Sequence, residues 1–110
     1  MLKTGLSPLE VDVAATRAAI EDPVVQVIDC REQNEWDAAH VEGTTLMPLD
    51  TIPQRMSELD KNQPVIVVCR SGRRSLLAAQ QMAAAGFSNV KSMNGGLIAW
   101  AELGYPLVAK

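Results

Sequence analysis

Apolar and polar positions along the chain alternate between short β-like runs and longer stretches with helical spacing. The runs VVQVID (residues 24–29) and VIVVC (65–69) are rich in β-branched residues and are bounded by polar residues or proline, so both are predicted strands. VIVVC is apolar at every position, which is typical of a central parallel strand that is covered on both faces. Shorter strands are expected over residues 44–47 and 90–93.

Helical segments are predicted between these strands. The segment Ser7-Pro8-Leu9-Glu10 matches a capping box with proline at the first helical position, which predicts a helix over residues 8–20. Other helices are expected over residues 32–39, 50–59 and 75–85, the last ending at Gly86, and a short final helix holds Trp100.

This alternation predicts a three-layer α/β fold with a small, mostly parallel central sheet flanked by helices. With 110 residues, 47% of them hydrophobic, the chain can bury one core, so residues 1–110 are expected to form a single domain. No apolar run approaches the roughly 20 residues that cross a bilayer, and residues 1–10 lack an apolar signal-peptide core. The cytoplasm is therefore the expected compartment.

Charge and cysteine content narrow the functions further. A net charge of −3 gives no general attraction to nucleic acid or to an anionic membrane. The two cysteines, Cys30 and Cys69, lie in no CxxC motif and in no Cys/His cluster with metal spacing. Reduced thiols are expected, with no metal and no other cofactor.

Cys69 stands where the most apolar predicted strand gives way to a helix. In parallel sheets ligands bind outside the carboxyl ends of the strands, and free amides at a helix start attract anions. Gly72 allows the backbone to curl inward, and Ser75 can steady the helix start. We expect these amides and the nearby arginines to favour a nucleophilic thiolate and an anionic substrate. The predicted substrate-binding residues are Arg70, Ser71, Gly72, Arg73 and Arg74.

Three segments resemble the signatures of single-domain rhodanese-like sulfurtransferases. They are DCREQNEWDAAHVEG (29–43), CRSGRRS (69–75) and NGGLIAWAELGYPL (94–107), and the resemblance covers roughly residues 24–106. Two departures are Ala39-His40-Val41 in place of the family's Gly-His-Ile, and Thr44 after Gly43.

This resemblance implies an enzyme in which Cys69 takes sulfane sulfur as a persulfide and passes it to a thiol or to cyanide. The donor would be a small anion, such as thiosulfate or a persulfide, that reaches the cysteine through an open cationic mouth. The acceptor would be glutathione, thioredoxin or a sulfur-accepting protein. The resemblance also implies that Asp29 supports the loop after Cys69 and that Arg31 faces it.

Two other functions remain open. Cysteine-dependent phosphatases and arsenate reductases of this scaffold place five residues between cysteine and arginine, but that position here is Ser75, and Arg74 comes one residue early. A catalytically idle protein-binding module is the second alternative, although this chain keeps both the cysteine and the cations. The shorter loop favours sulfur transfer.

The remaining candidates have structural interpretations. Arg70 and Arg73 are expected to orient the donor, whereas Arg74 is expected to hold the loop by pairing with Asp29. Cys30 is predicted to be a packed, inert thiol, and His40 to make a structural hydrogen bond. Packing roles are expected for Trp36 and Trp100, and a solvated face for Glu32, Glu35 and Asp37.

Overall fold

The computed structural model describes residues 6–110, whose strands form one five-stranded parallel sheet. The strands are β1 (Glu10–Val11), β2 (Gln26–Asp29), β3 (Thr45–Leu46), β4 (Val65–Val68) and β5 (Val90–Met93). Their order across the sheet is β1-β5-β4-β2-β3, and every neighbouring pair is parallel. All four side chains of β4 are buried at the centre, as its apolar run predicts.

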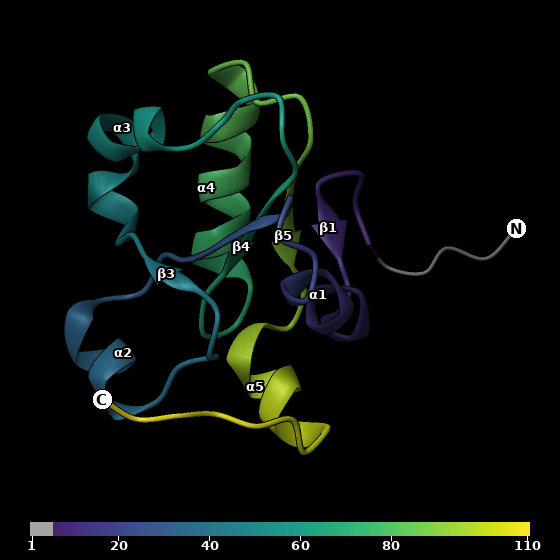
Figure 1. Ribbon diagram of the computed structural model, residues 1–110, viewed down its shortest axis with the longest axis vertical. Helices are drawn as coiled ribbons and strands as arrows, with labels where there is room; N and C mark the ends of the chain where they lie inside the picture. Colours follow the sequence, from purple (N-terminus) through teal and green to yellow (C-terminus); the bar gives the residue numbers. More distant parts are fainter. Residues whose placement is uncertain (1–5) are drawn as a thin grey trace, which may run out of the picture.

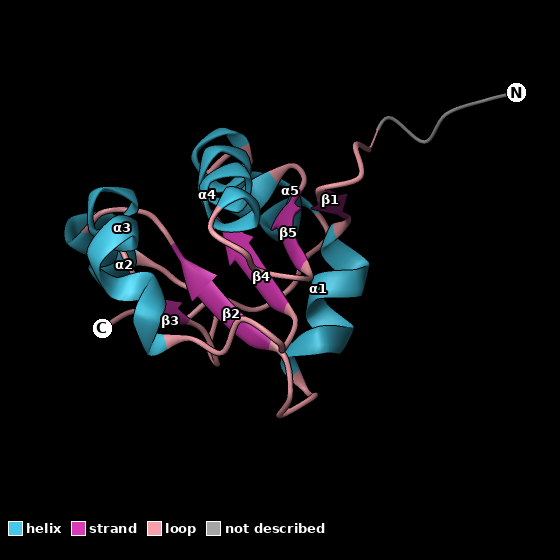
Figure 2. Cartoon of the chain, turned by 90° about the horizontal axis from the view of Figure 1, so that it is seen from above, coloured by secondary structure: helices cyan, strands magenta, loops and turns pink. Residues whose placement is uncertain are grey.

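Helices cover both faces of this sheet and complete a three-layer α/β fold (Figure 1). They are α1 (Val13–Ile20), α2 (Gln33–Ala38), α3 (Ile52–Arg55), α4 (Arg73–Ala84) and α5 (Gly96–Glu102), with two 3₁₀ turns, η1 (Leu49–Thr51) and η2 (Met56–Glu58). Figure 2 shows α4 and α1 on opposite sides of the strands. Alternate β4 residues enter two cores: Val67 packs in the cluster with Met82 of α4, and Val68 in the cluster with Trp100 of α5.

The first helix begins later than its capping signal predicts. The Ser7 amide does donate to Glu10 Oε1 at 2.9 Å, which is one half of a capping box, and the Glu10 amide donates to the Ser7 carbonyl at 3.0 Å, but these contacts close only a turn. Glu10 and Val11 instead pair with β5 at the edge of the sheet. Asp12 then caps α1 by accepting from the Ala15 amide at 2.7 Å. The prediction of a helix over residues 8–20 is wrong at its start because pairing with a distant strand outweighs the local cap.

Most other elements agree with the sequence prediction to within two residues. The exception is the segment expected as a helix over residues 50–59, which is divided into η1, α3 and η2. Pro53 has no amide hydrogen and suits the first turn of an α-helix, so the chain starts α3 there rather than continuing η1. Ile52, Met56 and Leu59 still pack on the core, as their spacing predicts.

The carboxyl ends of β2 and β4 meet at the same edge of the sheet. In Figure 1 the amino end of α4 points toward α2 and α5 at this edge. Over residues 6–110, no helix is long and apolar enough to cross a membrane, and no group of metal-ligating side chains is assembled. Residues 1–5, part of the segment inspected for a signal peptide, lie outside the described residues.

Candidate active site

Cys69 follows β4 directly and opens a loop that runs into α4. We call residues 69–75 the cysteine loop. Helix α4 begins at Arg73, two residues earlier than expected, so the first free helical amides lie inside the loop. The thiol does not face an open mouth: Cys69 is 0% exposed, because the short loop closes over its sulfur.

Donors from the loop converge on the single sulfur atom. The Gly72 amide donates to Cys69 Sγ at 3.0 Å and the Ser75 amide at 3.3 Å. Ser75 Oγ also lies 3.3 Å from Sγ and 2.7 Å from Ser92 Oγ. The thiol donates to this hydroxyl, and after ionisation the hydroxyl can donate to the thiolate, with Ser92 as its support.

The start of α5 fixes the direction of the loop peptides. The amides of Leu97 and Ile98 donate to the carbonyls of Cys69 and Arg70 at 2.8 and 3.1 Å. These carbonyls therefore point away from the sulfur. Gly96 lies so close that a Cβ atom there would collide with both carbonyls. Gly72 has a φ of +97°, a conformation that lets the loop amides turn inward.

The surroundings of Cys69 stabilise its ionised form. A hydrogen bond from the Cys30 thiol is the largest cause, followed by the opposing effect of burial and then by the bonds from Ser75 and Gly72. Together they lower the pKa of Cys69 to about 4. Since donors to an anion are worth more than donors to a neutral group, the sulfur is a thiolate at neutral pH.

Cys30 occupies the matching position on the neighbouring strand. It follows β2 as Cys69 follows β4, and its amide donates to the Val68 carbonyl at 2.9 Å. Cys30 is buried, as predicted, and both thiols are free. The interaction with the Cys69 sulfur, together with burial, raises the pKa of Cys30, so Cys30 keeps its proton beside the Cys69 thiolate.

The loop arginines divide into two groups. Arg70 and Arg73 are exposed, as is Ser71 between them. Arg74 pairs with Glu35 of α2 through two bonds of 2.8 and 2.9 Å. The expected pairing of Arg74 with Asp29 is therefore wrong, and so is the assignment of Glu35 to a solvated face. These bonds lower the pKa of Glu35 to about 2.

Asp29 is already neutralised by a neighbour in sequence. Its buried carboxylate accepts from Arg31 Nη2 at 2.8 Å and from the Arg31 amide at 3.0 Å. Arg31 also donates to the Ala39 carbonyl at 2.7 Å, so this pair ties the end of β2 to the end of α2. Because Arg31 saturates Asp29, Arg74 finds its partner on α2.

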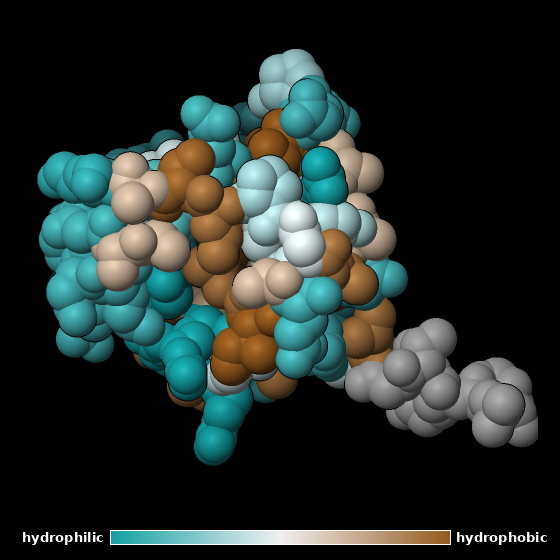
Figure 3. Space-filling model, turned by 90° about the horizontal axis from the view of Figure 1, so that it is seen from below, coloured by the Kyte–Doolittle hydropathy of each residue, from teal (hydrophilic) through white to brown (hydrophobic). Residues whose placement is uncertain are grey.

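A shallow pocket of about 360 Å³ lies beside the loop. Its polar rim comes from Arg31, Glu35 and Arg70, and its apolar lining includes Leu97 and Ile98 of α5. Figure 3 views the molecule from the α2 and α5 end and shows apolar surface running between hydrophilic areas. Because Arg31 lines the same pocket as Arg70, it lies close to the cysteine loop.

Structural roles account for the histidine and the two tryptophans. His40 Nδ1 lies 2.8 Å from the Trp36 carbonyl oxygen, and the two rings stack with centroids 3.7 Å apart. The structural hydrogen bond predicted for His40 is confirmed. Trp100 is buried, as predicted, and Trp36 is half-buried beneath His40.

Some site residues escape the sequence prediction. Ser92 supports Ser75, Glu35 holds Arg74, and Gly96 admits the loop carbonyls. A sequence signal exists only for Gly96, since the pair Gly95-Gly96 comes one residue after the strand predicted over residues 90–93. Ser92 and Glu35 are set by contacts between distant segments, which local patterns do not encode.

Comparisons with known proteins agree with this geometry. The family model described as "Rhodanese-like domain" matches residues 12–103. A "Sulfurtransferase" of Allochromatium vinosum is 38% identical over 85 residues, which are 77% of this chain and 79% of that protein. "Thiosulfate sulfurtransferase GlpE" of Pseudoalteromonas translucida is 33% identical over 90 residues, covering 82% of this chain and 86% of the relative.

Solved structures share the same fold. A rhodanese-related protein from Thermoplasma volcanium superimposes with a TM-score of 0.82 at 25% identity, covering 92% of this chain and 98% of its own. A rhodanese-like domain protein from Staphylococcus aureus gives a TM-score of 0.80 at 27% identity, with coverage of 92% and 97%.

Proposed function

This chain belongs to the rhodanese-like family and is a rhodanese-type sulfurtransferase, and from this premise we propose that Cys69 carries the transferred sulfur as a persulfide. The donor is a small anion such as thiosulfate or a persulfide. The acceptor is cyanide or a thiol, which in a reducing cytoplasm would be glutathione, thioredoxin or a sulfur-accepting protein.

The reaction has two displacement steps. The Cys69 thiolate attacks the outer sulfur of thiosulfate, the S–S bond breaks, and sulfite leaves with the electron pair. An acceptor then attacks the outer sulfur of the persulfide and releases the Cys69 thiolate. When the acceptor takes the outer sulfur, negative charge returns to Cys69 Sγ, where the Gly72 and Ser75 amides stabilise it.

The observation that carries this proposal is the convergence of the Gly72 and Ser75 amides on one sulfur atom, at 3.0 and 3.3 Å. A phosphate group would need donors spread around three oxygens, as well as an arginine at the position of Ser75. The cysteine loop is closed and places Arg74 one residue earlier than the phosphatase arginine, so it supports sulfur transfer over phosphate hydrolysis. The ionised cysteine argues against an idle binding module.

Access to the buried sulfur is part of this function. The exposed Arg70 and Arg73 attract an anionic donor to the loop, and side chains over the sulfur must move before the donor reaches it. The pocket beside the loop, lined by Leu97 and Ile98, offers a place for the acceptor.

The test is the Cys69→Ser variant in a thiosulfate:cyanide assay. Thiocyanate formation should fall to the uncatalysed rate. Intact-mass measurement after exposure to thiosulfate should find one extra sulfur on the Cys30→Ser chain, which keeps Cys69, but none on the Cys69→Ser chain. Ser57→Ala, at an exposed position on η2, is the matched control and should keep wild-type turnover. Persistent turnover by Cys69→Ser would remove Cys69 from the reaction.

A further inference from the structure

The two cysteines of this chain lie side by side at the catalytic edge. Asp29 and Val68 are direct partners in the β2–β4 register, so Cys30 and Cys69 are the next matched pair. Both side chains enter the core cluster that α4 covers. Neighbouring strands run about 4.8 Å apart. A disulfide needs Cα atoms about 4.4–6.8 Å apart, so the backbone can accept one here.

We propose that Cys30 is a resolving thiol that attacks Sγ of the Cys69 persulfide, releases the outer sulfur as hydrosulfide and leaves a Cys30–Cys69 disulfide. The inference rests on the persulfide proposed above. It gives the protein a second reaction: besides transferring sulfur to an acceptor, the chain reduces sulfane sulfur to sulfide.

The two cysteines and the bound sulfur supply all the atoms and electrons of this step. A bond forms between the Cys30 sulfur and Cys69 Sγ while the bond from Sγ to the outer sulfur breaks. The outer sulfur leaves with the bonding electron pair and takes the Cys30 proton. The two cysteine sulfurs are oxidised and the sulfane sulfur is reduced, so the release needs no other redox partner. An external thiol then reduces the disulfide and restores both thiols.

Geometry selects the inner sulfur as the point of attack. Cys30 and Cys69 are the matched pair that follows Asp29 and Val68, and both lie in one buried cluster, so the Cys30 sulfur is placed beside Cys69 Sγ. Cys30 approaches from the neighbouring strand, whereas the amides of Gly72 and Ser75 approach from the loop. The Cys30 side of Sγ is therefore a different side from the one that the two amides occupy.

Burial protects this internal route from competition. Cys30 and Cys69 are each 0% exposed, so a dissolved thiol reaches the persulfide only when the covering side chains move. Cys30 lies in the same buried cluster as Cys69, so its approach needs no opening of the covering side chains. Ionisation also favours the order of events. While Cys69 is a thiolate, its negative charge raises the pKa of Cys30, so Cys30 keeps its proton. When Cys69 carries a sulfur, the negative charge moves to the outer sulfur, and Cys30 can lose its proton more easily.

The experiment follows one loading event. The reduced, full-length protein is mixed anaerobically with one equivalent of thiosulfate and no acceptor, and hydrosulfide and intact mass are measured over time. The wild type should release close to one equivalent of hydrosulfide, lose two hydrogens in mass and resist alkylation at both cysteines. When the protein is diluted after loading, its release rate should not change, because the release step is intramolecular.

Two variants separate the thiol chemistry from the hydrogen bond. Cys30→Ser keeps a donor next to Cys69 but cannot form a disulfide, and Cys30→Val has the right size without a donor. Both should retain one extra sulfur on Cys69 and release hydrosulfide at least about tenfold more slowly than the wild type. Release by Cys30→Ser at the wild-type rate would overturn the proposal.

A remaining pair of outcomes distinguishes this inference from the proposed function. A wild-type chain that keeps its extra sulfur and forms no disulfide would overturn the role of Cys30, while the persulfide mechanism would stand. If neither the wild type nor Cys30→Ser gains a sulfur or releases hydrosulfide, the persulfide mechanism fails, and the resolving role fails with it.

Discussion

Four donors surround the Cys69 sulfur, and they are of three kinds: backbone amide, hydroxyl and thiol. They are the Gly72 amide, the Ser75 amide, the Ser75 hydroxyl and the Cys30 thiol. Burial alone would favour the neutral thiol, so the donors must outweigh desolvation for Cys69 to be ionised. The Cys69 sulfur is therefore a thiolate that accepts from several donors, and one of these donors is a second thiol.

The pH dependence of alkylation tests this description. Because the pKa of Cys69 is lowered to about 4, its thiolate fraction is complete above that value and is lost as the pH falls through it. In a Cys30→Ser background, the rate of reaction with iodoacetamide should stay level from neutral pH down to the weakly acidic range and then decline. In Cys30→Val, where a donor to the anion is missing, the decline should begin about one pH unit higher. A midpoint near 8.5, the value of a free thiol, would contradict the activated thiolate.

The cysteine loop depends on an element that is remote in sequence. Helix α5 donates two amides to the loop carbonyls, and Gly96 permits this contact at its first residue. The loop amides point at the sulfur because the carbonyls are engaged behind them. Helix α5 therefore supports the cysteine loop and also covers the core around Trp100.

Two glycine substitutions test the role of α5. Gly96→Ala should move α5 away from the loop, which costs about 1–3 kcal/mol in overpacking and lowers kcat at least about tenfold. Gly104→Ala is the matched control, since Gly104 also has a positive φ, of +76°, but has open space where the Cβ would lie. It should lose only about 1 kcal/mol of stability and leave kcat intact. Thermal melts and steady-state kinetics give both quantities, and equal losses of kcat would show that backbone strain, rather than the contact, matters.

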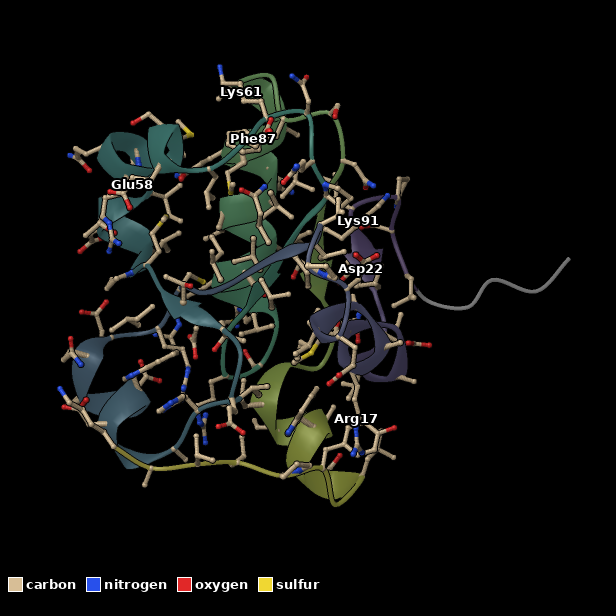
Figure 4. All side chains as sticks on the ribbon, viewed as in Figure 1. Arg17, Asp22, Glu58, Lys61, Phe87 and Lys91 are labelled. Atoms are coloured by element: carbon tan, nitrogen blue, oxygen red, sulfur yellow. The ribbon has the colours of Figure 1, made fainter. Side chains whose placement is uncertain are left out.

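The molecule as a whole is acidic, but its cysteine loop carries exposed positive charge. The net charge is −3, yet Arg70 and Arg73 stand exposed on the cysteine loop. Other cations are placed elsewhere: Lys61 lies beside Phe87 at the end of the molecule far from α5, and Arg17 lies over the Tyr105 ring at 4.2 Å (Figure 4). The field at the loop is therefore local and should be sensitive to salt.

Arg73→Ala and Arg74→Ala should differ in kinetics and stability. Loss of the exposed Arg73 should raise KM for thiosulfate about two- to fivefold, with an effect that shrinks in high salt and leaves the melting temperature unchanged. Loss of Arg74 leaves Glu35 without its cation and separates α2 from α4, so the melting temperature should fall by about 4 °C and kcat should fall with it. The measurements are a melt and kinetics at two salt concentrations. A destabilised Arg73→Ala beside a stable Arg74→Ala would reverse the two roles.

The sequence determined the features that depend on neighbours along the chain. Local pattern and spacing predict the apolar run of β4, the position of Cys69 at its end, the short cysteine loop and the amino end of α4. These features suffice for the fold class and for the choice of Cys69, because strand burial and helix-start amides are properties of short segments.

Only the tertiary structure decided which distant side chains meet. Arg74 pairs with Glu35 across 39 residues because Arg31 already saturates Asp29. The edge of β5 draws Glu10 and Val11 out of the expected helix. Cys30 reaches Cys69 because the β2–β4 register places them opposite each other. In each case several local partners are possible, and the packing of the sheet, which no short segment encodes, selects one of them.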